Sequence, residues 1–120
     1  RRAAGADVTF AGRVDAARLA ELRAQASVAV VPSRSVETFG LAAAEAMAAG
    51  LPVAATRIGA LTELLTEAQL APPGDAGALA EAITRVRGDA GTAARGLERV
   101  RGVASPDVVA PRLAEVYAAR

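Results

Sequence analysis

Residues 28–53 read VAVVPSRSVETFGLAAAEAMAAGLPV, and this stretch decides the fold. The apolar run at 28–31 predicts a strand covered on both faces, as in a parallel sheet. A polar loop follows it, and then an Ala-rich helix from about Phe39 to Ala49, with Gly50 in the position just past the helix end. Pro52 opens the next short strand. A strand, a loop and a helix leading into a further strand are typical of a parallel α/β sheet.

The loop between the first strand and its helix is the predicted ligand site. Open α/β sheets bind ligands at the carboxyl ends of their strands, and a helix N-terminus there offers free N–H groups to phosphate. The segment from Thr38 to Leu41 would supply these groups, and Gly40 allows a ligand to approach the backbone closely. Glu37 precedes the helix, whereas Glu45 lies inside it, about 12 Å further along at the helical rise per residue.

The two carboxylates therefore flank a place suited to phosphate. A nucleoside diphosphate sugar has the same layout, because its sugar hydroxyls lie at one end, its phosphates in the middle and its ribose hydroxyls at the other end. The position of each carboxylate can also be explained without a ligand. The helix dipole would stabilise Glu37 at that position, and Glu45 could be a solvated residue on the helix surface.

The rest of the chain alternates strands with helices, so the predicted class is α/β with a Rossmann-like parallel sheet flanked by helices. Asp15 and Asp75 are the expected N-caps of two helices, and Leu19 and Leu22 are spaced to form one buried face on the first of them. The four glycines between 88 and 102 leave that stretch without an assigned element. The predicted strands are 8–10, 28–31, 52–55 and 70–71, and the predicted helices are 15–26, 39–49, 59–67, 75–86 and 105–120.

The composition excludes several function classes. The 120 residues suffice for one domain, and they include no Cys and no His, which excludes thiol and imidazole chemistry and the usual zinc sites. The 14 basic and 13 acidic residues are interspersed and aromatic residues make up 2%, so no nucleic-acid partner is expected. No apolar run has the length of a membrane span and no signal peptide is visible, so a cytoplasmic location is expected.

A set of motifs in this chain resembles glycosyltransferase family 4, including its E-x7-E signature. The motifs are Pro32-Ser33, Glu37-Thr38-Phe39-Gly40-Leu41, Glu45 to Val53, Val8 to Val14, Ile58 to Glu63 and Leu70 to Asp75. The resemblance implies the GT-B fold, in which two Rossmann-like domains face a cleft. Residues 1–120 would be the C-terminal part of the donor-binding domain, with its upstream strands and the N-terminal acceptor domain absent. We therefore expect an incomplete sheet in which the strands at 28–31 and 53–55 are parallel neighbours.

The resemblance also implies an activity, namely transfer of a sugar from a nucleoside diphosphate sugar to an acceptor with retention of the anomeric configuration. No cofactor and no bound metal ion are expected. The partners would be the nucleotide sugar and the acceptor domain, and the parent protein could associate peripherally with the inner face of the membrane. The chain alone is expected to be inactive.

The family's site roles carry over by position. Glu37, the candidate catalytic residue, would contact the hydroxyls of the donor sugar, and Glu45 would accept hydrogen bonds from the ribose. The donor-binding residues implied by the resemblance are Glu37, Thr38, Phe39, Gly40, Leu41 and Glu45, with Gly12, Arg13 and Val14 touching the base.

Three alternatives remain at this point. The chain could be a non-catalytic nucleotide-sugar-binding or interaction fragment, or part of a nucleotide-sugar epimerase. A glycoside hydrolase would need two carboxyl groups about 5–10 Å apart across a sugar. Ser33 and Ser35 lie close to the proposed site, but serines are common in loops and neither is assigned a role.

Overall fold

Three parallel strands form the described sheet, in a computed structural model that describes residues 7–119. The strands are β1 (Ala29–Val31), β2 (Val53–Thr56) and β3 (Leu70–Ala71), in the order β1-β2-β3. In the register of the sheet, Ala29 lies opposite Val53, and Ala55 lies opposite Leu70. The prediction that the strands at 28–31 and 53–55 are parallel neighbours is confirmed.

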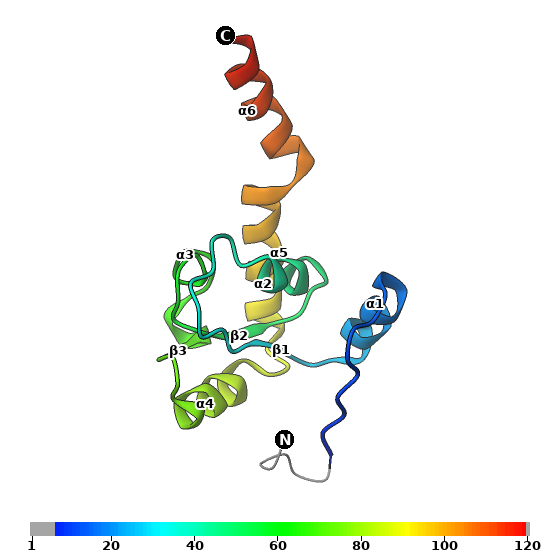
Figure 1. The fold of residues 1–120 in the computed structure, drawn as a ribbon, viewed down its shortest axis with the longest axis vertical. Helices are drawn as coiled ribbons and strands as arrows, with labels where there is room; N and C mark the ends of the chain where they lie inside the picture. The colour runs from blue at the N-terminus through cyan, green and yellow to red at the C-terminus, as the bar shows by residue number, and fades with distance from the viewer. Residues whose placement is uncertain (1–6, 120) are drawn as a thin grey trace.

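Helices cover both faces of this sheet (Figure 1). One face carries α2 with α5 packed against it, and the other face carries α4. The helices are α1 (Ala16–Gln25), α2 (Leu41–Ala48), α3 (Leu61–Leu64), the 3-10 helix η1 (Glu67–Gln69), α4 (Ala76–Val86), α5 (Ala90–Ala104) and α6 (Pro106–Ala118). The predicted class, a Rossmann-like parallel sheet flanked by helices, is confirmed.

The core is split between the two faces because successive residues of a strand point to opposite sides. Val53 of β2 belongs to the core beneath α2, where Met47 and Leu61 are fully buried. Its neighbour Ala54 belongs to the core beneath α4, with Ala82 and Val86 among its members. All four residues of β2 are buried, so the strand is held inside the core. The loop that leaves its carboxyl end therefore starts from a fixed position.

Residues 8–10 do not form the predicted strand. Val8 and Phe10 are 54% and 65% exposed, and the segment pairs with none of the three described strands. An extended segment becomes a strand only when a neighbour takes up its backbone hydrogen bonds. The short run Val8-Thr9-Phe10 by itself therefore overpredicted this element.

Strand β1 is also less covered than predicted. Val30 is 39% exposed and lies opposite Ala54, so it belongs to the face that α4 covers. The contacts of α4 are made mainly with β2, β3 and η1, and this leaves the outer strand open on that side. The first helix likewise has a weaker apolar face than expected, because Leu19 and Leu22 of α1 are only half-buried.

The glycine-containing stretch at 88–102 forms most of the long helix α5. Asp89 caps this helix by accepting a hydrogen bond from the Gly91 N–H at 2.9 Å and from the Thr92 hydroxyl at 2.8 Å. The Thr92 hydrogen bonds lower the pKa of the Asp89 carboxyl. A Cβ at Gly96 would lie 3.4 Å from Met47 Cγ, which is ordinary van der Waals contact, so this face of α5 packs directly against α2. Tertiary packing thus overrides the low helix propensity of glycine here.

Beyond α5 the chain bends at Ser105 and continues as α6, which projects away from the sheet (Figure 1). The predicted start of this helix at Ser105-Pro106-Asp107 is confirmed. Leu113 and Val116 of α6 are 51% and 57% exposed. None of the helices within residues 7–119 is both long enough and apolar enough to cross a bilayer.

Candidate functional site

The predicted site loop, residues 32–40, begins directly after β1 and is anchored to the end of β2. The hydroxyl of Thr56, the last residue of β2 and itself buried, donates a hydrogen bond to the Ser33 carbonyl oxygen at 2.7 Å. The Ala60 N–H donates to the Glu37 carbonyl oxygen at 2.8 Å. The loop therefore lies at the carboxyl edge of the sheet, where open α/β folds bind their ligands.

Glu37 lies ahead of α2, as predicted, and its carboxylate has a partner inside the loop. The Ser33 hydroxyl donates a hydrogen bond to Glu37 Oε1 at 2.5 Å. Both residues are half-buried. Hydrogen bonds to ionised groups are short and directional, so Ser33 restricts the orientation of this carboxylate. Sequence reasoning gave no role to Ser33, although its place four residues before Glu37 in a turning loop was a usable signal.

Two glycines allow this loop to sit against the β2–α3 connection. Gly59 has a φ of +51°, and a Cβ there would overlap the Glu37 carbonyl oxygen and lie 3.0 Å from the Glu37 nitrogen. Gly40 has a φ of +78°, and a Cβ there would lie 2.9 Å from Leu61 Cδ2. Residues with a side chain avoid such positive φ values. The position of Glu37 thus depends on close backbone contact with Gly59.

The N-terminus of α2 faces the predicted phosphate position without a cap of its own. The helix begins at Leu41, two residues later than predicted, because Gly40 takes the N-cap position in the left-handed conformation. No side-chain hydrogen bond caps it among the described residues. Phe39 and Leu41 are 46% and 61% exposed, whereas Gly40 and Ala43 are buried, so one side of the first turn faces solvent. This uncapped turn is the candidate anion-binding position.

Glu45 lies in the second turn of α2, inside the helix as predicted, and it is paired. Arg23 Nη2 lies 2.6 Å from Glu45 Oε2. Sequence reasoning missed Arg23, because it lies 22 residues away on α1 and no local pattern links the two.

The structure does not bring the predicted base-contacting residues into contact with the loop. Gly12, Arg13 and Val14 precede α1, and Val14 is half-buried while the other two are exposed. In the part of the chain that the structure describes, they make no hydrogen bond or ion pair with residues 32–40 or with α2. Their role in binding the base stays a prediction.

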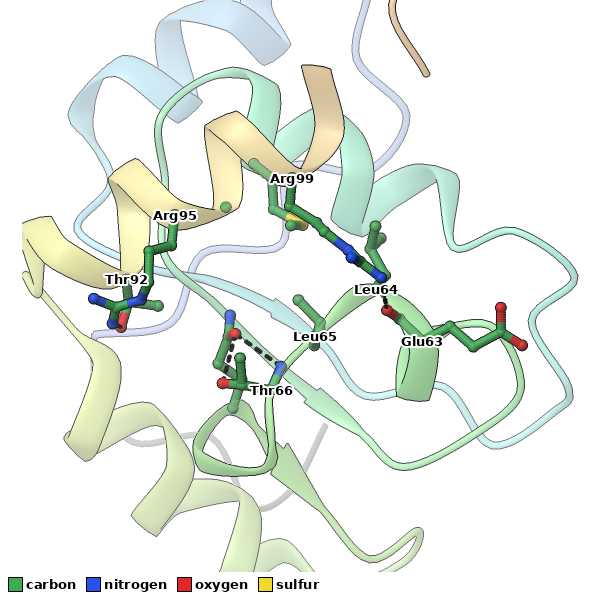
Figure 2. Close-up of a pocket in the computed structure, with 10 residues that line it drawn as sticks. Glu63, Leu64, Leu65, Thr66, Thr92, Arg95 and Arg99 are labelled. Carbon is green, nitrogen blue, oxygen red and sulfur yellow. Dashed lines mark hydrogen bonds between the residues drawn. The ribbon is translucent and has the colours of Figure 1, made fainter. Parts of the chain in front are cut away.

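One cavity lies away from the two glutamates of the predicted site. It measures about 310 Å³ and is enclosed by α5 on one side and by α3 and η1 on the other (Figure 2). Arg99 donates to the Glu63 carbonyl oxygen at 2.8 Å, and Arg95 donates to the Thr92 hydroxyl at 3.2 Å. Both arginines are exposed, and each donates to a neutral oxygen rather than to a carboxylate. A smaller cavity of about 170 Å³ lies beside Thr38 and Phe39.

Within residues 7–119, no group of three or more acidic, His or Cys side chains is placed to hold a metal ion. The structure places two carboxylates at the predicted site, and each has one side-chain partner, Ser33 for Glu37 and the charged Arg23 for Glu45. The uncapped start of α2 lies between them along the chain.

Comparison with known proteins gives matches to one family over most of the chain. The family model described as "Glycosyl transferases group 1" matches residues 1–89. The chain is 39% identical over 79 residues to phosphatidyl-myo-inositol mannosyltransferase of Mycobacterium leprae, covering 63% of this chain and 21% of that protein. It is 42% identical over 82 residues to GDP-mannose-dependent alpha-(1-6)-phosphatidylinositol dimannoside mannosyltransferase of Mycobacterium tuberculosis, covering 68% of this chain and 19% of that protein.

The structural comparison extends further along the chain. The solved structure of sucrose-phosphate synthase from Thermosynechococcus elongatus superposes with a TM-score of 0.79 and 39% sequence identity. The match covers 91% of this chain and 29% of that structure. The matched part of the chain spans about a fifth of the length of these two mannosyltransferases.

Proposed function

Because this chain belongs to the glycosyl transferases group 1 family, we propose that it provides the donor-binding part of a retaining glycosyltransferase. The family resemblance and the C-terminal GT-B fold expected from the motifs are confirmed by the family and structure matches. The substrate would be a nucleoside diphosphate sugar. One observation carries the proposal: an uncapped helix N-terminus lies between Glu37 before the helix and Glu45 within it.

In this proposal the diphosphate binds at the first turn of α2. When the bond between the anomeric carbon and the phosphate oxygen breaks, negative charge develops on the leaving diphosphate. The N–H groups and the positive dipole end of α2 would stabilise that charge, in place of a metal ion. Glu37 would orient the sugar through its hydroxyl groups, and Glu45 would bind the ribose. The acceptor hydroxyl oxygen then forms the new bond to the anomeric carbon, and its proton passes to the oxygen of the departing diphosphate.

The relatives support a nucleotide-sugar donor but name different sugars and acceptors. The Mycobacterium tuberculosis relative is named as GDP-mannose-dependent, which makes GDP-mannose a sensible first probe. The structural neighbour is a sucrose-phosphate synthase. Since the described site presents two carboxylates and backbone N–H groups rather than a sugar-specific pocket, the proposal names the donor class and not the sugar.

The proposal predicts that the two glutamates bind different ends of the donor. In the full-length protein, Glu45→Gln should weaken GDP and GDP-mannose alike by about tenfold, because a hydrogen bond to a charged group is lost at the ribose. Glu37→Gln should weaken GDP-mannose and leave GDP unchanged. Isothermal titration calorimetry of both variants with both ligands measures this, and Glu98→Gln on the exposed side of α5 is the control.

A result in which the two variants behave alike is also informative. Equal losses for both ligands in both variants would contradict this orientation and indicate a general folding defect. If UDP and UDP-glucose bind the wild type in place of the guanine nucleotides, the same comparison is made with them.

The Ser33–Glu37 hydrogen bond gives a second expected result. Ser33→Ala should lower the transfer rate at saturating donor by about three- to tenfold, because the Glu37 carboxylate loses the donor that orients it. Ser35→Ala is the matched control, since Ser35 is an exposed residue of the same loop with no side-chain hydrogen bond among the described residues. Equal rates for the two variants would show that Ser33 does not orient Glu37.

A further inference from the structure

Arg23 links α1 to the helix of the proposed site. Its guanidinium nitrogen Nη2 lies 2.6 Å from Glu45 Oε2, across 22 residues of sequence. The Arg23 side chain is 24% exposed and is the more buried partner, whereas the Glu45 side chain is 46% exposed. No residue of α1, which lies wholly within the described part of the chain, is fully buried. The ion pair is therefore a specific contact between α1 and α2, two helices that pack little surface against each other.

The pair leaves part of the carboxylate available. Arg23 contacts only Oε2, and the described part of the chain gives Glu45 Oε1 no hydrogen-bond donor. An ionised carboxylate accepts on both oxygens. The guanidinium is permanently charged and directional, so this single contact favours one orientation of the carboxylate.

We propose that Arg23 is a positioning residue that holds the Glu45 carboxylate in the orientation that binds the ribose of the donor. This inference rests on the proposed function, since it takes the ribose role of Glu45 as its premise. Arg23 itself does not touch the ligand. It keeps Oε2 occupied, so that Oε1 is directed toward the ribose hydroxyls and the carboxylate does not rotate freely at the helix surface.

A second ion pair of α1 is more exposed to solvent and lies entirely within that helix. Arg18 Nη1 lies 2.8 Å from Glu21 Oε2, three residues along α1, and these side chains are 53% and 61% exposed. Exposed pairs of this kind contribute little to stability. Arg18 is therefore a matched control for Arg23, with the same side chain on the same helix and no contact with α2.

The test uses the full-length protein, titrated calorimetrically with GDP and with UDP. For whichever nucleotide binds the wild type, Arg23→Gln should weaken binding by about tenfold. Arg23→Lys should recover part of that loss, and Arg18→Gln should change nothing. Circular dichroism establishes that each variant is folded, and Arg23→Lys keeps the test decisive if Arg23→Gln does not fold.

A nucleotide without ribose hydroxyls separates positioning from a general structural role. The 2′,3′-dideoxy form of the same nucleoside diphosphate should bind the wild type and Arg23→Gln with equal affinity. This nucleotide lacks the two ribose hydroxyls that Glu45 would bind. On the Glu45→Gln background, adding Arg23→Gln should cost less than twofold, since residues acting through one contact are not additive. Equal loss for the normal and dideoxy nucleotides would overturn the inference, and so would tighter binding after removal of Arg23.

Binding by the Glu45 and Arg23 variants separates the ribose role of Glu45 from the positioning role of Arg23. If Glu45→Gln weakens nucleotide binding but Arg23→Gln does not, the positioning role is wrong and the proposed function stands. If Glu45→Gln leaves nucleotide binding unchanged, the ribose role itself is wrong. Binding of neither GDP nor UDP to the wild type would overturn both.

Discussion

Replacing Glu37 by glutamine in the full-length protein is expected to lower the rate of sugar transfer by about ten- to hundredfold. The loss corresponds to one hydrogen bond to a charged group, about 1.5–3 kcal/mol, removed from the transition state. Glutamine has nearly the same shape as glutamate, and the backbone contact from Ala60 to the Glu37 carbonyl oxygen does not involve the side chain. The fold should therefore persist. The measurement is kcat/KM for the donor, obtained from the release of the nucleoside diphosphate at saturating acceptor.

Two other outcomes would point to different functions. Unchanged turnover, matching the Glu98→Gln control on α5, would mean that Glu37 is only a carboxylate favoured by the α2 dipole. If the wild type mainly released free sugar into water without needing an acceptor, glycoside hydrolysis would replace transfer as the assigned reaction. In that case the two carboxylates would have to act across the same sugar ring.

Replacing Gly59 by alanine is expected to destabilise the fold by more than about 3 kcal/mol. The new Cβ would overlap the Glu37 carbonyl oxygen and approach the Glu37 nitrogen, and neither backbone atom can move without displacing the site loop. The positive φ of Gly59 adds conformational strain to this clash. Urea unfolding measures the lost free energy, and donor binding reports the displaced loop.

The control for Gly59 is Gly88→Ala. Gly88 also has a positive φ, +72°, but a Cβ there would meet no atom within 4 Å. That variant should lose only the strain of a left-handed residue, about 1–2 kcal/mol. Equal losses at the two positions would mean that the contact between Gly59 and Glu37 does not matter for stability.

The central unit of the fold, from β1 through α2 to β2, was predictable because its signals are local. Apolar runs mark the strands, and Gly50 has the positive φ expected just past the end of α2. Asp75 caps α4 as predicted, accepting a hydrogen bond from the Ala78 N–H at 2.9 Å. The placement of Glu37 before α2 and Glu45 within it follows from the same short-range pattern.

Local signals failed where a distant partner decides the outcome. Residues 8–10 have the pattern of a strand, but they pair with none of the three described strands, and Val8 and Phe10 are exposed. The stretch at 88–102 has the glycine content of a loop, yet it forms most of α5, because that helix packs against α2, where Gly96 lies beside Met47. Propensity is a weak guide when packing against another element outweighs it.

The sequence by itself determined the α/β class, the strand–loop–helix unit and the two glutamates that flank the helix start. All of these depend on residues that are close together in the chain. The tertiary structure alone decided how those glutamates are held. Arg23 reaches Glu45 from another helix, and Gly59 meets the backbone of Glu37 from the loop after β2. Such contacts join segments that are far apart in sequence, so they exist only once packing of the elements has brought the segments together.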